Sequence, residues 1–235
     1  MTAAPFRCAA IVTDIEGTTG SIAFVRDELF PYAKAALGEF VARRRAEPAV
    51  AACLREAALY AGEPDASDER IVALLREWID EDRKITPLKT LQGLIWAEGY
   101  VRGLLRGHVY ADAVAGLRRW HAEGIALYVY SSGSIAAQKL LFGHSIAGDL
   151  VPLFRGYFDT TVGAKSDAAA YGRIAETIGV APANVLFLSD REAELDAAHA
   201  AGWQVACLAR PADTPPGVTS KFRSFASFDE IAIAR

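Results

Sequence analysis

The chain has 235 residues, of which 52% are apolar and 23% are charged, and its formal net charge at pH 7 is −4. This length suits one large α/β domain or a core domain with an insertion, and no Lys/Arg-rich block supplies the basic face that non-specific nucleic-acid binding requires. The three cysteines are far apart and lack CxxC spacing, so they indicate neither a disulfide framework nor a zinc site.

The sequence pattern also carries no membrane or export signal. No apolar run approaches the roughly 20 residues that span a bilayer. The apolar stretch after Arg7 is cut short at Asp14, before it could form the core of a signal peptide. We therefore expect a cytoplasmic protein that binds neither a membrane nor nucleic acid.

An apolar run at residues 8–13 predicts a buried strand that delivers two acids, Asp14 and Glu16, into a turn at Gly17. Ligands of parallel α/β sheets gather outside the carboxyl ends of the strands. This layout is typical of a metal-assisted phosphate site, with Asp14 as nucleophile or metal ligand and Glu16 placed to exchange protons. The alternative is that Asp14 only caps a turn through its own backbone.

The region that follows contains no convincing strand. Its periodicity predicts helices at residues 25–45, 49–61, 68–82 and 87–105. A helical insertion directly after the acidic loop suggests a cap domain at residues 21–105, with residues 1–20 and 106–235 forming a Rossmann-like catalytic core. The alternative is a single core whose first crossover is long.

Beyond residue 106, short apolar runs alternate with helical patterns. Strands are predicted at residues 125–130, 185–188 and 205–208, with a weaker candidate at 156–161. Helices are predicted at residues 111–123, 134–142, 167–178 and 192–201. This alternation predicts the α/β fold class, a parallel sheet with helices on both faces. The tail from Arg210 is expected to pack as loop and short helix.

Two of the predicted strand-to-helix junctions carry residues suited to a phosphate group. Ser131 and Ser132 follow the second strand, where hydroxyl groups and a helix N-terminus can donate hydrogen bonds to an anion. Ser134 has the alternative role of capping the next helix. Lys165 precedes another helix and would supply a fixed cation, although an isolated loop lysine is usually solvated.

Asp190 ends the next predicted strand in the same way that Asp14 ends the first. Two carboxylates on neighbouring strands can share one Mg²⁺ ion, which prefers oxygen ligands and keeps several waters. Glu194 lies one helical turn further and could hold a metal-bound water. Each of these signals is weak alone, but their joint occurrence at one sheet edge favours a catalytic site.

The order of these motifs resembles the haloacid dehalogenase superfamily of phosphotransferases over nearly the whole chain. The first motif of that superfamily usually reads D-x-D-x-T, whereas here it reads Asp14-Ile15-Glu16-Gly17-Thr18. This glutamate, together with longer segments, is similar to the enolase-phosphatase family of methionine salvage. Those segments lie at residues 21–25, 29–33, 88–96, 130–134 and 137–145.

The resemblance implies a Mg²⁺-dependent bifunctional enzyme with one metal ion per subunit. It would enolise 2,3-diketo-5-methylthiopentyl-1-phosphate and then remove the phosphate through an aspartyl-phosphate intermediate, giving an acireductone. The family is generally monomeric, so the expected partner is this small-molecule phosphorylated diketone. The alternative is a Mg²⁺-dependent phosphomonoesterase that acts on another small metabolite. A signalling receiver domain is disfavoured by the helical insertion and by the spacing of the first acids.

The resemblance also assigns roles to particular residues. The implied catalytic residues are Asp14, Glu16 and Lys165. The implied metal-site residues are Asp14, Glu16 and Asp190, and the implied substrate contacts are Ser131, Ser132 and Lys165. Glu16 is our candidate for the base of the enolisation step, because its extra methylene group changes its reach compared with aspartate.

The helix expected from Pro87 carries two side-chain stripes at helical spacing. The first consists of Leu88, Leu91 and Ile95, and we expect it to form the core of the cap. The second consists of Lys89, Gln92, Trp96 and Tyr100. This second stripe could line an apolar pocket for the methylthio group, although aromatic stripes more often serve packing.

Overall fold

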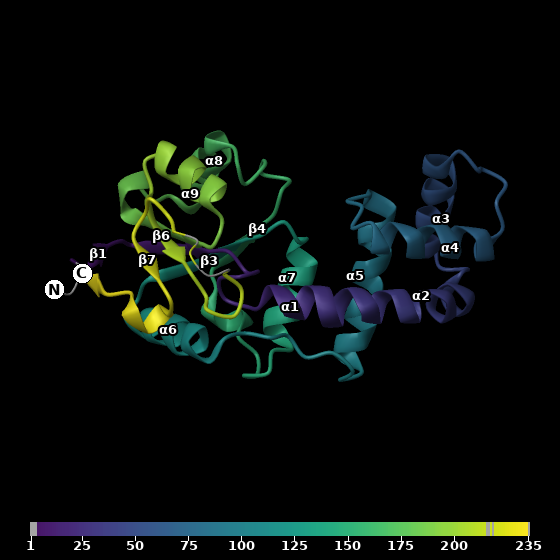
Figure 1. Ribbon diagram of the computed structural model, residues 1–235, viewed down its shortest axis with the longest axis horizontal. Coiled ribbons are helices and arrows are strands. Elements are labelled where there is room, and N and C mark those ends of the chain that lie inside the picture. Colours follow the sequence, from purple (N-terminus) through teal and green to yellow (C-terminus); the bar gives the residue numbers. More distant parts are fainter. Residues whose placement is uncertain (1–3, 215–216, 218, 235) are drawn as a thin grey trace. The chain divides into compact units, whose positions relative to one another are not determined.

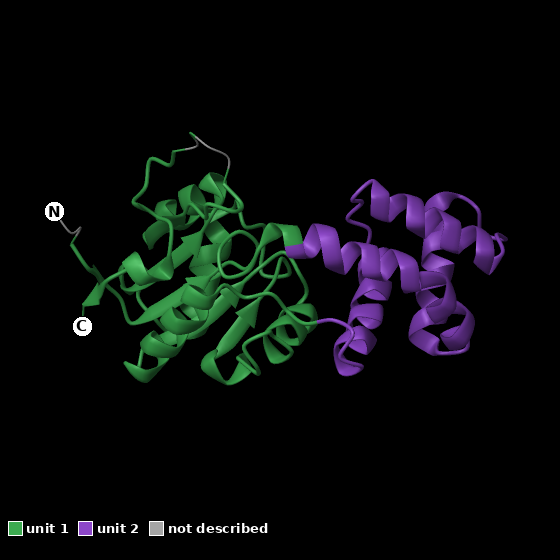
Figure 2. Ribbon diagram, turned by 60° about the horizontal axis from the view of Figure 1, so that its bottom comes forward, with its two compact units in different colours: residues 1–23, 106–235 green, residues 24–105 purple. Residues whose placement is uncertain are grey.

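The computed structural model describes residues 4–214, 217 and 219–234. It contains two compact units, which Figure 2 colours separately. The first unit consists of the chain up to Ala23 and from Arg106 onward, and the second unit consists of Phe24–Leu105. Each unit has a hydrophobic core of its own.

The second unit begins later than the sequence pattern predicts, because residues 21–23 belong to the first unit. The reason is local hydrogen bonding. The Ser21 hydroxyl and the Ile22 N–H both donate to the carboxylate of Asp213, which lies in the first unit, at 3.2 Å each. These bonds hold the segment that leaves the first unit against that unit's own loop.

A six-stranded parallel sheet forms the centre of the first unit, with strand order β4-β3-β2-β5-β6-β7. The strands β2, β3 and β5 are buried at every position, and their apolar sequences are typical of strands that are covered on both faces. The predicted α/β fold class is thereby confirmed. The sheet consists of β2 (Ala10–Thr13), β3 (Ala126–Tyr130), β4 (Gly156–Phe158), β5 (Val185–Ser189), β6 (Gln204–Leu208) and β7 (Ser224–Phe225).

The register of the three central strands aligns their carboxyl ends. Thr13, the last residue of β2, lies opposite the penultimate residues of β3 and β5. Because the strands are parallel, the loops that follow them leave the sheet at the same edge. These loops begin at Asp14, Ser131 and Asp190.

Helices cover both faces of the sheet (Figure 1). On one face, α8 (Ala168–Ile178) and α9 (Glu192–Ala200) share a core with side chains of β2, β3, β5 and β6. On the opposite side lies α6 (Ala111–Ala122), which precedes β3, and α7 (Ile135–Gly143) follows that strand. The described chain also forms the short 3₁₀ helices η2 (Val151–Leu153) and η3 (Pro182–Asn184).

The C-terminal tail contains more strand than the sequence pattern predicts. The strand β7 extends the sheet beside β6, and β8 (Ile233–Ala234) pairs in parallel with β1 (Phe6–Arg7). Between β7 and β8 lies a short helix of the expected kind, the 3₁₀ helix η4 (Phe228–Glu230). The strands β7 and β8 have only two residues each, too few for a hydrophobic alternation to reveal them.

The second unit consists of helices. The chain enters it through α1 (Ile22–Phe24) and a π-helical turn, η1 (Val25–Leu29), and then forms α2 (Phe30–Arg44), α3 (Pro48–Ala61), α4 (Asp68–Asp80) and α5 (Thr86–Val101). Prolines in the first turn of α3 and α5 suit the helix start, where an N–H is not needed.

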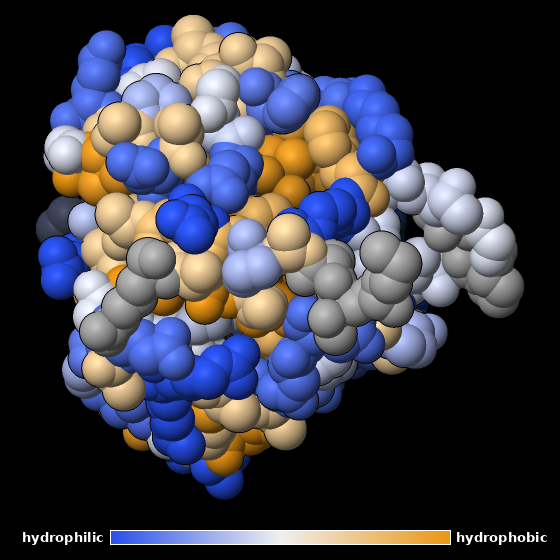
Figure 3. Space-filling model, turned by 90° about the vertical axis from the view of Figure 1, so that its left-hand side faces the viewer, coloured by the Kyte–Doolittle hydropathy of each residue, from blue (hydrophilic) through white to orange (hydrophobic). Residues whose placement is uncertain are grey.

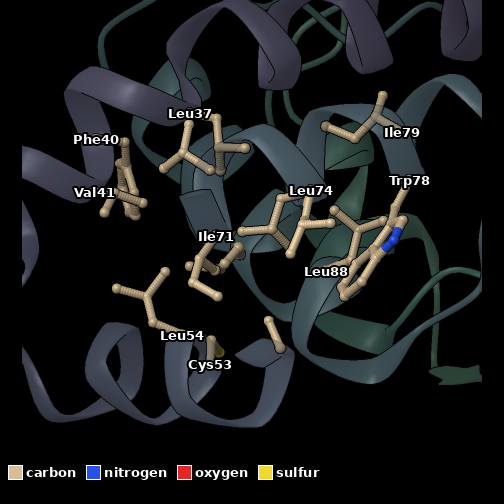
Figure 4. Close-up of a cluster of buried hydrophobic side chains, with 14 of the residues drawn as sticks. Leu37, Phe40, Val41, Cys53, Leu54, Ile71, Leu74, Trp78, Ile79 and Leu88 are labelled. Atoms are coloured by element: carbon tan, nitrogen blue, oxygen red, sulfur yellow. The ribbon is translucent and has the colours of Figure 1, made fainter. Parts of the chain in front are cut away.

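The core of the second unit is drawn in Figure 4, where Leu37, Ile71 and Leu88 come together from three helices. The predicted core stripe of α5 is buried, with Leu91 at 0% and Ile95 at 1% exposure. These side chains belong to the cluster in Figure 4, so burial of this stripe against α2, α3 and α4 holds the unit together.

The surface is mixed in character. On the face of the molecule that Figure 3 shows, hydrophilic and hydrophobic side chains are interspersed, which is ordinary for a folded chain. Within the described residues, none of the helices has the length and apolarity that crossing a membrane would demand.

Candidate active site

The loop after β2 folds into a tight turn that holds Asp14 at the sheet edge. The carbonyl of Ile15 accepts hydrogen bonds from the N–H groups of Thr18, Thr19 and Gly20, at 3.2, 3.0 and 2.8 Å. The Asp14 carbonyl accepts from the hydroxyls of Thr13 and Thr19 on either side. The backbone that carries the Asp14 carboxylate is therefore held by these local bonds and by the Asp14 N–H, which donates to the Leu188 carbonyl of β5 at 2.9 Å.

Gly17 is a position in this turn where a side chain would not fit. Its φ is +71°, in the left-handed region. A Cβ atom there would lie 2.6 Å from Asp190 Oδ2 and 3.2 Å from Ile22. The close approach places the Asp190 carboxylate, which follows β5, directly against the turn that follows β2.

Lys165 lies beside Asp14, although the two are far apart in sequence. Its Nζ atom is 2.6 Å from Asp14 Oδ1 and 2.6 Å from Glu194 Oε2, and all three side chains are largely buried. Tyr171 of α8 donates to the Lys165 carbonyl at 2.7 Å, and the ammonium lies 5.7 Å from the centre of the Tyr130 ring. The ammonium is thus held between two carboxylates.

Burial and charge act in opposite directions on Lys165. Burial lowers the pKa of its ammonium, but the carboxylates of Asp14 and Glu194 outweigh burial and raise the pKa above its ordinary value. Burial and the charge of Asp14 raise the pKa of Glu194, partly offset by Lys165. Ser189 donates to Glu194 at 2.9 Å. Glu194, which from the sequence could hold a metal-bound water, forms an ion pair with Lys165 through Oε2.

Asp190 has the chemistry of a metal ligand. Burial, followed by the charges of Asp14 and Glu194, raises the pKa of Asp190 to about 7. Its Oδ1 atom is buried and has no hydrogen-bond partner among the described residues. An ionised oxygen that lacks a partner and faces other carboxylates fits a hard divalent cation.

The described side chains do not form a complete ligand set for such a cation. Within residues 4–214, 217 and 219–234, no cluster of three or more His, Cys, Asp or Glu side chains is arranged to hold a metal. Mg²⁺ commonly binds through one or two carboxylates and retains waters. The pair Asp14 and Asp190, with backbone oxygens and water, therefore fits Mg²⁺ better than it fits a metal that needs several side chains.

The loop after β3 places Ser131 and Ser132 at the same edge. Ser131 is buried, its N–H donates to the Phe158 carbonyl at 3.2 Å, and its Oγ accepts from the Gly133 N–H at 3.3 Å. Ser132 is exposed. Ser134 accepts from the Ala137 N–H, so it caps α7, the alternative role considered for it from the sequence.

Glu16 lies in the same turn as Asp14 and is half-buried. Its backbone forms an isolated bridge with Gly20, which keeps residue 16 next to the sheet edge. The structure thus brings Asp14, Lys165 and Asp190 together, with Glu16 and Ser131 on the adjoining loops.

Sequence reasoning missed two residues that support these loops. Gln138 of α7 donates from Nε2 to the carbonyls of Gly133 and Phe158, at 2.8 Å each. Arg210, in the tail, donates to the Thr18 carbonyl of the Asp14 turn. The available signals were the place of Gln138 in the segment 137–145, which resembles the family, and an arginine shortly after an apolar strand.

The second side-chain stripe of α5 takes part in packing. Trp96 donates from Nε1 to the Leu29 carbonyl at 2.9 Å and stacks on Phe30 with ring centres 6.1 Å apart. Gln92 and Tyr100 are 6% and 3% exposed. These contacts lie within the second unit and favour a packing role over a pocket.

A parallel sheet whose carboxyl edge presents two acids, a hydroxyl loop and a buried lysine is the architecture of a haloacid dehalogenase-like hydrolase. The family model with that description matches residues 8–202. An enolase-phosphatase E1 from Pseudomonas aeruginosa is 55% identical over 95% of this chain and 98% of its own length. Another enolase-phosphatase E1, from Azotobacter vinelandii, is 60% identical over 86% of this chain and 88% of its own.

A solved structure agrees with these sequence relatives. The UTR4 protein of Saccharomyces cerevisiae is 33% identical, with a TM-score of 0.81 over 95% of this chain and 99% of that chain. The chain belongs to the enolase-phosphatase E1 family of the haloacid dehalogenase-like hydrolases. It is accordingly an enzyme of the phosphatase class, as the sequence motifs predicted.

Proposed function

We propose that the protein is a Mg²⁺-dependent bifunctional enzyme that converts 2,3-diketo-5-methylthiopentyl-1-phosphate to its enol, and then to an acireductone and phosphate, in methionine salvage. It acts as a cytoplasmic monomer with one Mg²⁺ per chain. Membership of the enolase-phosphatase E1 family supports this proposal. The observation that carries it is the buried Asp14 carboxylate, held by Lys165 at 2.6 Å and adjoined by Asp190.

Asp14 is the nucleophile of the phosphatase half-reaction. Lys165 occupies Oδ1 of its carboxylate, so the other oxygen is the one that attacks phosphorus. Attack forms a bond from that oxygen to phosphorus and breaks the bond to the enol oxygen, which leaves with the electron pair. Water then attacks the aspartyl phosphate, releases inorganic phosphate and regenerates Asp14.

Lys165 has a second role, which is electrostatic. Since its two carboxylate neighbours raise the pKa of its ammonium, Lys165 stays protonated at neutral pH. A fixed positive charge in a buried site stabilises the negative charge that builds up during phosphoryl transfer. Lys165 also reaches the substrate phosphate from this position.

The remaining phosphate contacts come from the loops on either side. Ser131, Ser132 and the backbone N–H groups near Gly17 donate to the phosphoryl oxygens. Asp14, Asp190 and the backbone at Glu16 would hold Mg²⁺. When bound, this ion supplies positive charge that lets an anionic nucleophile approach an anionic phosphate and polarises the substrate carbonyl.

Glu16 is the proposed base of the enolisation step. It is half-buried beside the nucleophile, and its carboxylate is one methylene longer than the aspartate usual at this motif position. It would take the proton from the carbon next to the carbonyl and return it to solvent or to the enol oxygen.

The test follows both products in one reaction. A Mg²⁺ titration with the diketone phosphate is monitored by the ultraviolet absorbance of the enol and by inorganic phosphate. We expect both signals in the native enzyme, no phosphate from Asp14→Asn, and no deuterium exchange at the acidic carbon with Glu16→Gln. Phosphate release without any enol signal would instead support a phosphomonoesterase that acts on another metabolite.

A further inference from the structure

Arg210 is a buried charge that the proposed mechanism does not use. It follows β6 and is 3% exposed. Its Nε and Nη2 atoms donate to the Thr18 carbonyl at 3.0 and 2.8 Å, and Nη1 donates to Asp112 Oδ2 at 2.6 Å and to the Ala226 carbonyl at 3.2 Å. The guanidinium therefore forms hydrogen bonds with three separate segments of the first unit.

Aromatic rings and an ionised carboxylate surround this guanidinium. It lies over the rings of Tyr110 and Phe228, at 4.5 and 5.1 Å from their centres. Burial would raise the pKa of Asp112, but the bond from Arg210 and the Phe228 N–H lower it below its ordinary value, so this carboxylate stays ionised as the counter-charge. Ser227 and the Phe228 N–H also donate to Asp112, at 3.0 and 2.8 Å.

The group that Arg210 holds belongs to the turn of the nucleophile. Thr18 is fully buried, and the internal bonds of the turn end on the carbonyls of Asp14, Ile15 and Gly20, so the Thr18 carbonyl needs a partner from outside. Arg210 provides two N–H groups for it, and the Tyr110 N–H donates to the next carbonyl, that of Thr19, at 2.9 Å. The turn is therefore anchored from outside at two successive carbonyls.

We propose that Arg210 is a positioning residue for the phosphatase reaction. By holding the Thr18 carbonyl, it fixes the turn that follows β2, and with it the Asp14 carboxylate, relative to the substrate phosphate. This inference rests on the proposed function. Its chemistry requires arginine, since the planar fork makes two bonds to one carbonyl and a third to a carboxylate, whereas a lysine ammonium is a single point of charge.

The experiment compares Arg210→Lys with Arg223→Lys. Arg223 also stacks on two rings of the first unit, Phe6 at 4.1 Å and Phe225 at 5.4 Å, so its replacement loses similar packing without touching the Thr18 carbonyl. We expect Arg210→Lys to lower kcat about ten- to hundredfold, since small displacements of reacting groups have effects of this size, with KM changed less than threefold. Arg223→Lys should keep kcat within twofold of the native enzyme.

Amide hydrogen exchange supplies a readout that does not depend on turnover. Residues 17–20 should exchange faster in Arg210→Lys than in Arg223→Lys, and Asp112→Asn, which weakens the support of Arg210, should show the same change to a smaller extent. If Arg210→Lys does not fold, the comparison of Asp112→Asn with Arg223→Lys decides the matter. Native kcat and native exchange in Arg210→Lys or Asp112→Asn would overturn the positioning role. Absence of phosphate release by the native enzyme would overturn the proposed function instead.

Discussion

Asp190 and Lys165 respond to burial in the same site with different outcomes. Burial and two neighbouring carboxylates raise the pKa of Asp190 to about 7. Burial lowers the pKa of Lys165, but the neighbouring carboxylates of Asp14 and Glu194 outweigh burial, so its pKa lies above the ordinary value. Near neutral pH, Lys165 therefore remains protonated, while Asp190 without a metal lies at the midpoint of its titration.

This difference predicts a pH-dependent effect of Asp190→Asn on metal-depleted protein. The pKa of Asp190 in the folded state, about 7, lies above the value of about 3.9 for an unfolded chain. The protonated form therefore contributes stability that is fully present below about pH 4 and is lost as the pH rises through about 7. Asparagine avoids this loss, so Asp190→Asn should raise Tm clearly at pH 8 and less at pH 5.

Scanning fluorimetry after EDTA treatment measures this effect. The control is Asp196→Asn, because Asp196 lies further along α9, is half-exposed and pairs with Lys221. It should change Tm little at either pH. Added Mg²⁺ should raise Tm of the native protein at pH 8 more than that of Asp190→Asn, since a ligand stabilises only the form that binds it. Equal stabilisation by Asp190→Asn at both pH values would contradict the titration of Asp190 in this range.

At the scale of elements, one side chain of α7 bonds to two carbonyls at the sheet edge. Gln138 donates to the carbonyls of Gly133 and Phe158, in the loop after β3 and at the end of β4. Its Oε1 atom is buried and has no hydrogen-bond partner in the described chain. The side chain thus donates to the two carbonyls, and these bonds hold the loop that carries Ser131 and Ser132.

Gln138→Met should therefore weaken both stability and substrate binding. It keeps the side-chain volume but removes the Gln138 donor from both carbonyls, so that the Phe158 carbonyl keeps the Ser131 N–H at 3.2 Å; losing the Gln138 bonds costs about 1–3 kcal/mol. We expect a lower urea midpoint and a KM raised several-fold, with kcat less affected. Lys139→Met, at the exposed neighbouring position of the same helix, is the control and should alter neither value appreciably. An unchanged KM in Gln138→Met would show that this side chain does not support the loop that carries Ser131 and Ser132.

Elements were predictable from the sequence where burial is strong and local. The central strands and most helices follow from apolar runs and periodicity, and the register of parallel strands then aligns Asp14, Ser131 and Asp190 without further information. Contacts that join distant segments left no local pattern. Gln138 and Arg210 donate to backbone carbonyls that are distant in the chain. Every residue has a backbone carbonyl, so the sequence does not mark which one accepts the bond.

At the scale of the whole molecule, Asp213 joins the two segments through which the chain leaves and re-enters the first unit. Its carboxylate accepts from the Ser21 hydroxyl and the Ile22 N–H on the outgoing segment, and from the Tyr110 hydroxyl on the returning one. The Ser21 N–H also donates to His108 Nδ1 at 3.1 Å. One carboxylate thus holds both of these segments within the first unit.

Asp213→Ala should loosen both crossings while the two cores remain folded. The arginines Arg26 and Arg106 are exposed close to these segments, so limited trypsin digestion reports on their local opening. Loss of about 1–2 kcal/mol of hydrogen bonding would speed cleavage at both sites about five- to thirtyfold. Cleavage after Arg83, in the loop between α4 and α5, is the internal control and should keep its native rate, because that loop makes no bond to Asp213 among those described. Tyr110→Phe removes one donor only and should give a smaller acceleration, whereas acceleration at all three arginines alike would mean that Asp213→Ala destabilises the protein as a whole.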